Sequence, residues 1–186
     1  MIPGTDPMFD AAFMEVIGVE QGFVDHPSDQ GGPTNFGITE ATARHFGYTG
    51  DMRMMPMAVA KDIYRRGFYD PLRLAEVGAI AGARIVNELF EQNVNLRALQ
   101  AGRHLQRALN SFNQRGRFYP DIVVDGDIGD KTLDALRGFV RSRGVPGTRV
   151  LFRALNAQQG TYYLVRGEAR PLNEDFTYGW FDKRVA

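Results

Sequence analysis

Apolar residues recur at helical spacing near the start of the chain. Every fourth position there is a large apolar residue: Phe9, Phe13 and Ile17. With Asp10 available as a cap, this pattern predicts an amphipathic helix from about Asp10 to Gln21. Glu20 then falls in the last helical turn, where the partial negative charge of a helix C-terminus raises the cost of ionising a carboxylate. The pattern therefore favours a protonated acid at this position.

The polar stretch after this predicted helix is dense in turn-forming residues. The segment from Pro27 to Pro33 contains Gly31-Gly32, which suits a hairpin. Two short strands on either side of that turn would bring Asp29 and Thr34 back toward Glu20. Such a cluster is suited to cleaving a glycosidic bond, because one carboxylic acid can protonate the leaving oxygen while a second group positions water or stabilises positive charge.

Three further segments in the first half of the chain show helical patterns. Thr39 can cap a short helix that ends at Gly47, and Pro56 suits the first position of a helix that continues to Tyr69. The apolar residues from Ile80 to Asn95 imply a central, mostly buried helix. The polar residues of this last segment are expected along its more polar sides: Glu88, Glu91, Asn93 and Asn95.

The second half of the chain also reads as helical. Asp125-Gly126 predicts a turn, Asp130 a helix cap, and Thr148 the cap of another helix. No Pro-, Gly- or Ser-rich linker separates the halves near Asn95 to Ala101, so they are expected to pack as one body. The predicted fold class is α+β, mainly α, with a small β-hairpin beside the helix that carries Glu20.

Composition narrows the possible partners. The chain has 186 residues, 44% of them hydrophobic, enough for one sizeable core or two small ones. A formal net charge of +0 provides no strong basic field, so nucleic acid is not an expected partner. The absence of cysteine excludes disulfides and thiolate chemistry. Neither an export signal nor a run approaching the ~20 apolar residues of a membrane span is recognisable, so no stable membrane association is expected.

The stretch from Glu20 to Thr39 resembles the signature of glycoside hydrolase family 108, the N-acetylmuramidases of phage-endolysin type. That signature runs Glu-x-Gly-Tyr/Phe-Val, then Pro-x-Asp-x-Gly-Gly, then Thr-Asn-Tyr/Phe-Gly-Ile-Thr. The matching residues are Glu20, Gly22, Phe23, Val24, Pro27, Asp29, Gly31, Gly32, Thr34, Asn35, Phe36, Gly37, Ile38 and Thr39. The resemblance implies a lysozyme-like helical bundle in which Glu20 is the catalytic general acid.

Later segments extend the resemblance over most of the chain. Asp51 to Arg53 and Ala60 to Tyr69 match further family motifs, although Glu91 stands where the family usually has aspartate. The segment from Ala98 onward resembles the predicted peptidoglycan-binding segment of these muramidases, and Thr177 to Val185 resembles the family's Gly-Trp and Arg-Val ending. We therefore expect a catalytic region at 8–96 and a peptidoglycan-binding-like region at 97–186. Residues 1–7 look like an expression remnant, with Met8 the expected native start.

Two groups are candidates for the second catalytic role. Asp29 would orient water or stabilise the oxocarbenium-like transition state, with Thr34 holding the water, while Asp25 is an alternative second carboxylate that ranks below Asp29. Asp29 could instead serve only its own turn, and Thr34 only its strand. The expected substrate contacts are Asp25, Asn35, Phe36, Tyr69, Glu91, Asn95 and Trp180. Large aromatic residues are more often core than sugar platforms.

No metal or cofactor is expected, because His26, His45 and His104 are scattered and Gly31-Gly32 lacks the pattern of a phosphate loop. The resemblance implies hydrolysis of the β-1,4 bond between N-acetylmuramic acid and N-acetylglucosamine of bacterial peptidoglycan. The absence of a recognisable signal peptide predicts that such an enzyme stays in the cytoplasm until a partner such as a phage holin opens the membrane, and a monomer is expected. The alternatives are a non-catalytic peptidoglycan-binding protein or a secretion-associated accessory protein with the same fold.

Overall fold

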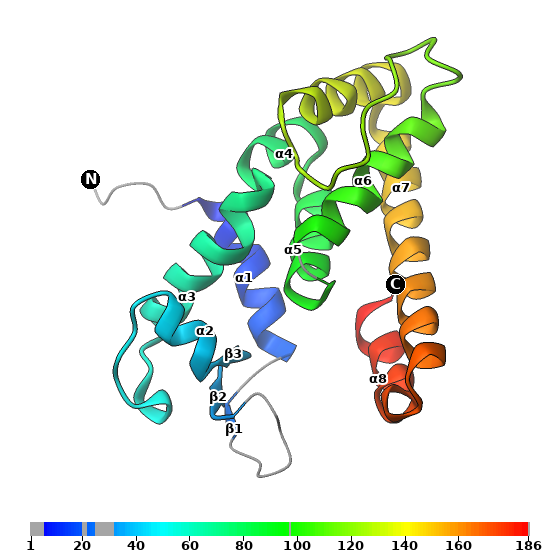
Figure 1. Ribbon diagram of the computed structural model, residues 1–186. Helices are drawn as coiled ribbons and strands as arrows, with labels where there is room; N and C mark the ends of the chain where they lie inside the picture. The colour runs from blue at the N-terminus through cyan, green and yellow to red at the C-terminus, as the bar shows by residue number, and fades with distance from the viewer. Residues whose placement is uncertain (1–5, 20–21, 25–31, 97, 186) are drawn as a thin grey trace, which may run out of the picture. The chain divides into compact units, whose positions relative to one another are not determined.

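The computed structural model describes residues 6–19, 22–24, 32–96 and 98–185 (Figure 1). The chain divides into two compact units, residues 1–71 and 72–186. Unit 1 contains three helices, α1 (Pro7–Val19), α2 (Glu40–His45) and α3 (Met57–Tyr64), and the strands β1 (Phe23–Val24), β2 (Thr34–Asn35) and β3 (Ile38–Thr39) among its described residues. Unit 2 is helical throughout its described elements. The predicted domain boundary at residue 96 stays a prediction.

Helix α1 has the predicted core face but an earlier start. Phe9, Phe13 and Ile17 are all buried, as their spacing predicts. The helix begins at Pro7 because the Asp6 Oδ1 atom accepts hydrogen bonds from the backbone N–H groups of Met8 and Phe9, at 3.0 and 3.1 Å. The predicted cap, Asp10, is inside the helix and pairs with Lys61 at 2.7 Å. The interpretation of residues 1–7 as an expression remnant stays a prediction.

Among the described residues the sheet has three antiparallel strands in the order β1-β2-β3, where the sequence predicted two around a hairpin. Val24 pairs with Thr34, and Thr34 pairs with Thr39. The strands β2 and β3 are joined by Phe36 and Gly37, whose φ angles of 51° and 70° are both left-handed. A two-residue hairpin turn of this kind needs positive φ at both positions, which explains the glycine.

The helical segments that follow agree closely with the predicted ones. The Thr39 Oγ1 atom accepts a hydrogen bond from the Thr42 N–H at 3.3 Å and so caps α2, and Gly47 ends it with a φ of 90°. A 3₁₀ turn at Met52–Met54 leads to α3, which begins after Pro56. The helix then continues to Tyr69 as the wider π turn Arg65–Tyr69, followed by a 3₁₀ turn at Asp70–Leu72.

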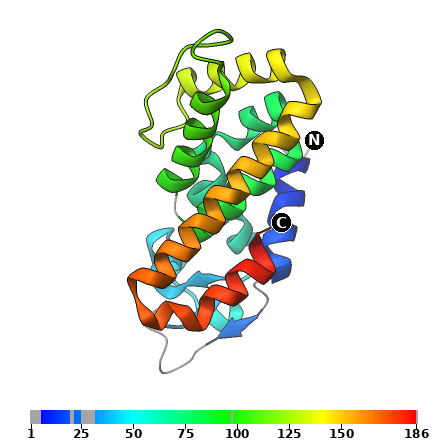
Figure 2. The same ribbon diagram turned by 90° about the vertical axis from the view of Figure 1, so that its right-hand side faces the viewer.

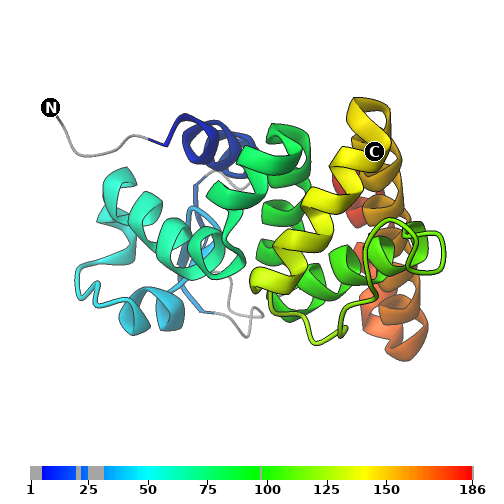
Figure 3. The ribbon, with the colours of Figure 1, turned by 90° about the horizontal axis from the view of Figure 1, so that it is seen from above.

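Unit 2 consists of α4 (Leu74–Ala81), α5 (Ala83–Leu96), α6 (Ala98–Phe112), α7 (Asp130–Ala169), a 3₁₀ turn at Pro171–Asn173 and α8 (Glu174–Arg184). The first part of α7, yellow in Figure 3, lies beside α4. Its second part, orange in Figure 2, is followed by α8, which runs back along it. The helices α4, α6 and α7 all pack against α5.

The structure corrects several predicted boundaries in unit 2. The segment expected to form one helix from Ile80 to Asn95 belongs to two helices. Gly82, with a φ of 84° and a ψ of 171°, has a non-helical backbone and separates α4 from α5. Asp130 is the first residue of α7 rather than its cap, and its carboxylate bonds Arg73 at 2.8 Å. Helix α7 bends at Gly144, so Thr148 lies inside a helix and bonds the Val145 carbonyl instead of capping.

The polar residues of α5, predicted along its more polar sides, are largely covered by other helices. Glu88, Gln92 and Asn93 are buried, because α4, α6 and α7 all pack against α5. Glu91 and Asn95 are only partly exposed. Helical periodicity identified the core position of α5 correctly but did not show that its polar face is covered as well.

Candidate active site

The predicted general acid Glu20, the predicted second catalytic group Asp29 and its lower-ranked alternative Asp25 lie outside the described residues, and their roles stay predictions. The structure describes the elements on either side of Glu20 in the sequence. Helix α1 is fixed by its buried aromatic face, with the Phe9 and Phe13 rings 4.9 and 5.5 Å from those of Tyr69 and Tyr64.

Gly22, on the other side of Glu20 in the sequence, has a φ of 107°. Glycine adopts this conformation far more readily than residues with a side chain. The positive φ angle therefore explains why glycine occupies this position of the signature. The strand β1 begins at the next residue, Phe23.

Thr34 lies on the middle strand of the sheet and is partly buried. Its hydroxyl group donates a hydrogen bond to the Gly32 carbonyl at 3.1 Å. A hydroxyl has one proton and two lone pairs, so Thr34 Oγ1 in this arrangement can only accept a hydrogen bond from a water molecule. The geometry is compatible with its predicted task of holding water.

Three predicted substrate contacts in unit 1 have different environments. The Asn35 side chain is buried, and its Nδ2 atom donates to the Met52 carbonyl at 2.7 Å, so it ties β2 to the 3₁₀ turn. Phe36 is partly exposed, and its carbonyl accepts from the Tyr64 hydroxyl at 3.0 Å. Tyr69 is fully buried and donates to Asp6 at 3.0 Å. Tyr69 therefore belongs to the core, and its ring is not exposed for stacking on a sugar.

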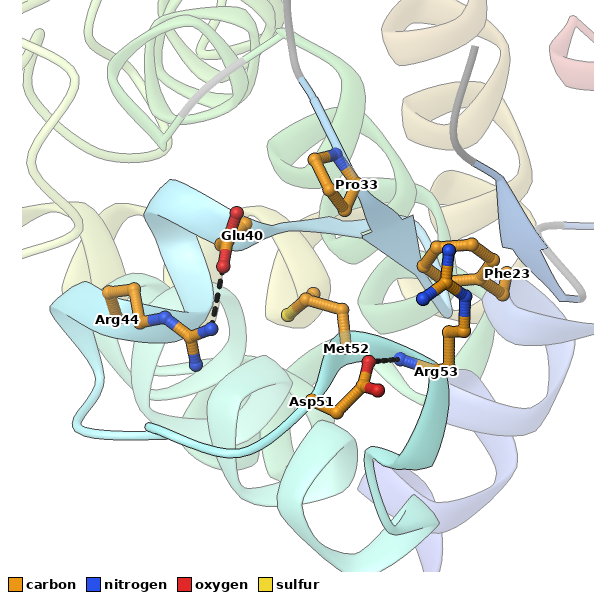
Figure 4. A pocket seen from close by; sticks show the side chains of 7 residues that line it. All are labelled: Phe23, Pro33, Glu40, Arg44, Asp51, Met52 and Arg53. Atoms are coloured by element: carbon orange, nitrogen blue, oxygen red, sulfur yellow. Dashed lines mark hydrogen bonds and ion pairs between the residues drawn. The ribbon is translucent and has the colours of Figure 1, made fainter.

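A small hollow, partly open to solvent, lies beside the sheet (Figure 4). Its lining residues are Phe23, Pro33, Glu40, Arg44, Asp51, Met52 and Arg53. The Arg53 guanidinium lies 4.9 Å from the centre of the Phe23 ring, and the Asp51 carboxylate accepts from the Arg53 N–H at 2.9 Å. Glu40 and Arg44 pair at 2.6 Å. The sequence match at Asp51 to Arg53 was the available signal for this hollow, which periodicity alone did not indicate.

Glu91, Asn95 and Trp180, the predicted substrate contacts of unit 2, belong to one cluster. The Glu91 carboxylate accepts hydrogen bonds from Asn95 Nδ2 at 2.7 Å and from Gln159 Nε2 at 2.5 Å. Gln159 also donates to the Tyr163 hydroxyl at 3.0 Å, and the Tyr163 ring contacts Trp180. The structure therefore joins residues of α5, α7 and α8, and two of them, Glu91 and Gln159, are 68 positions apart along the chain.

Sequence reasoning missed a chain of buried polar groups in unit 2. Gln92 Nε2 donates to Glu88 at 2.6 Å, while Gln92 Oε1 lies 2.8 Å from His104 Nδ1. Because an amide oxygen only accepts, His104 carries its proton on Nδ1. Burial raises the pKa of Glu88 to about 7, although hydrogen bonds from Gln92 and Asn156 oppose the rise. Burial and the charge of Arg107 lower the pKa of His104 to about 4.

Glu88 and His104 are expected to make opposite contributions to the pH dependence of the free energy of unfolding. The pKa of Glu88 is raised from 4.5 to about 7, so its contribution to stability falls as pH rises through this range. The pKa of His104 is lowered from 6.5 to about 4, so its contribution falls as pH drops through that range. The two contributions largely cancel in the unsubstituted protein between pH 4.5 and 6.5.

Replacing one group is expected to unmask the other. The free energy of unfolding of Glu88→Gln, compared with that of the unsubstituted protein, is expected to fall by on the order of 2 kcal/mol as the pH drops from 6.5 to 4.5. That of His104→Asn is expected to fall by a similar amount as the pH rises from 4.5 to 6.5. Urea denaturation at a series of pH values measures the slopes. The slope is the readout, because each substitution also changes a buried hydrogen bond. Parallel curves for the three proteins would contradict the assignment.

Within the described ranges, no three side chains of His, Cys, Asp or Glu come together in a way that could hold a metal ion. None of the described helices combines the length and apolarity that crossing a membrane requires.

Comparison with known proteins relates the chain to two sequence families. Residues 13–96 match the family described as Glycosyl hydrolase 108, and residues 100–185 match a Predicted Peptidoglycan domain. No curated protein matches the chain. The solved structure of SagA from Brucella abortus is similar, with a TM-score of 0.66 and 24% sequence identity over 96% of this chain and 90% of that one. This likeness confirms the predicted mainly helical, lysozyme-like α+β fold.

The two family matches together account for nearly the whole sequence, from the core face of α1 to the end of α8. The chain therefore combines a region of the glycosyl hydrolase 108 type with a C-terminal predicted peptidoglycan domain, and it is a glycosidase that acts on peptidoglycan.

Proposed function

We propose that the protein is an N-acetylmuramidase that hydrolyses the β-1,4 bond between N-acetylmuramic acid and N-acetylglucosamine in peptidoglycan. The observation that carries the proposal is the glycosyl hydrolase match over residues 13–96, which contains the whole signature from Glu20 to Thr39. The predicted peptidoglycan domain at 100–185 supports the choice of substrate.

Glu20 acts as the general acid in this proposal and protonates the glycosidic oxygen as the bond breaks. The described part of α1 ends at Val19, so the negative end of its helix dipole is adjacent in sequence to Glu20. Asp29 orients water or stabilises the oxocarbenium-like transition state, with Asp25 as the alternative second carboxylate. Thr34, whose proton is donated to the Gly32 carbonyl, accepts a hydrogen bond from the water.

The bond that is cleaved can be identified from the new reducing ends. Purified Gram-negative-type sacculi are incubated with the protein, reduced with borohydride and hydrolysed in acid, and the amino-sugar alcohols are separated. Muramitol is the expected product, because a muramidase leaves N-acetylmuramic acid at the reducing end. Glucosaminitol would show cleavage of the other glycosidic bond, and anhydro products without a new reducing end would contradict hydrolysis. A non-catalytic wall-binding protein would sediment with the sacculi but release no reducing ends.

The same assay with EDTA serves as a control on mechanism. A reaction that uses two carboxyl groups needs no metal ion, so the rate is expected to stay unchanged on chelation. Loss of activity that returns when a divalent metal is restored would contradict the proposed roles of Glu20 and Asp29.

A further inference from the structure

Helix α8 carries a strip of side chains that is aromatic at one end and charged at the other. Phe176, Trp180 and Arg184 follow one another at a spacing of four residues and so lie on the same side of the helix. The Phe176 and Trp180 rings are nearly parallel, at 20° with centroids 6.4 Å apart. Trp180 also packs against the buried ring of Tyr163 on α7, at 5.3 Å. Phe176, the N-terminal residue of the strip, is 59% exposed.

The other end of the strip is polar. The Arg184 Nε atom lies 3.8 Å from the Glu91 carboxylate, and the two side chains retain 19% and 24% of their surface exposed. Asn95 donates to the same carboxylate at 2.7 Å. An exposed aromatic platform therefore leads into partly exposed charged and amide groups, all within unit 2.

This combination suits an amino sugar. One face of a pyranose ring presents C–H groups that stack on an aromatic ring, while its rim presents hydroxyl and acetamido groups that need hydrogen-bond partners. Binding sites for such ligands combine apolar and aromatic surface with a few placed polar groups. The strip has both parts in that order, and α8 lies inside the region that matches a predicted peptidoglycan domain.

We propose that the strip formed by Phe176, Trp180 and Arg184, together with Glu91 and Asn95, is a surface of unit 2 that holds a glycan strand. One N-acetylated amino sugar stacks on Phe176, and a later sugar of the same strand places its hydroxyl and acetamido groups at the Arg184 and Glu91 end, about 12 Å further along the helix. The inference rests on the proposed function in that it takes the peptidoglycan glycan as the ligand. It adds a binding surface separate from the residues proposed for bond cleavage in unit 1.

The protein provides its own probe, because Trp180 is its only tryptophan. Titration of the full chain carrying Glu20→Gln with an oligomer of N-acetylglucosamine is expected to change the tryptophan fluorescence in a saturable way. The Glu20 substitution prevents turnover of the ligand during the measurement. A glucose oligomer, which lacks the acetamido group, is expected to bind more weakly. Sedimentation with purified sacculi tests the natural polymer.

Phe176→Ala is expected to weaken binding to the oligomer and to sacculi roughly tenfold through the loss of one stacking ring. The matched control is Tyr178→Ala, because Tyr178 is an aromatic residue of the same helix that is 83% exposed and lies about half a turn away from the strip. This control is expected to bind like the parent. Circular dichroism checks that both variants keep their helices.

Unchanged binding by Phe176→Ala, or an equal loss in Tyr178→Ala, would overturn the proposal. A fluorescence change that follows protein concentration without any glycan would assign the strip to contact with a second copy and would overturn it too. The binding result can be distinguished from the result of the reducing-end assay, because glycan binding is measured with Glu20→Gln and does not require turnover. Glycan binding without release of muramitol would keep the strip and reject the muramidase reaction.

Discussion

Glu20→Gln is expected to lower the rate of peptidoglycan cleavage by about 10²-fold or more. Glutamine has nearly the same shape as glutamate but cannot donate the proton that the leaving oxygen requires. The substitution adds no volume, so thermal unfolding should be nearly unchanged. Release of reducing ends from sacculi measures the rate, and a thermal melt measures the fold.

The matched control is Glu15→Gln, which removes the same charge from an exposed position of α1. Its turnover is expected to be close to that of the parent protein. Near-normal turnover of Glu20→Gln would contradict the assignment and move the general acid to another carboxyl group, with Asp25 the next to test. A similar loss in both variants would instead indicate a nonspecific effect of charge on α1.

Gly102→Ala is expected to cost more than about 3 kcal/mol of stability, at the upper end of the range for overpacked positions. A Cβ atom on Gly102 would lie 1.9 Å from the carbonyl oxygen of Gly126, which is backbone and cannot rotate away. The contact cannot open easily, because Gln106 accepts from the Gly126 N–H at 2.8 Å and donates to Asp125 at 2.8 Å. Urea denaturation of the purified variant measures the loss.

Gly179→Ala provides the matched control for this change. Gly179 lies in α8, and a Cβ atom there would meet nothing within 4 Å. Alanine loses less backbone entropy on folding than glycine, so the control is expected to gain about 0.5 to 1 kcal/mol. A stability of Gly102→Ala within about 0.5 kcal/mol of the parent would show that α6 and the loop at Gly126 approach less closely than the structure places them.

The candidate site was predicted from the sequence to the extent that its residues form one continuous signature. The pattern from Glu20 to Thr39 indicated the chemistry because those residue types occur together in one short stretch. It did not predict that the Asn35 side chain would donate a hydrogen bond to the Met52 carbonyl, or that the Thr34 hydroxyl would donate to the Gly32 carbonyl. Such hydrogen bonds depend on which backbone groups the fold brings near, and the Met52 carbonyl belongs to a turn 17 positions further along.

Interactions between residues close together in the sequence determined much of the fold. The buried face of α1, the Thr39 cap and the Gly47 helix end all follow from periodicity, capping and left-handed glycine within a few residues. Tertiary structure decided what depends on distant neighbours. Glu88 and Gln92 are buried because other helices cover α5, and Tyr69 joins the core because Asp6, 63 positions away, accepts its hydrogen bond. A polar side chain carries no local sign of whether another element will cover it, so its burial emerged only when the helices packed together.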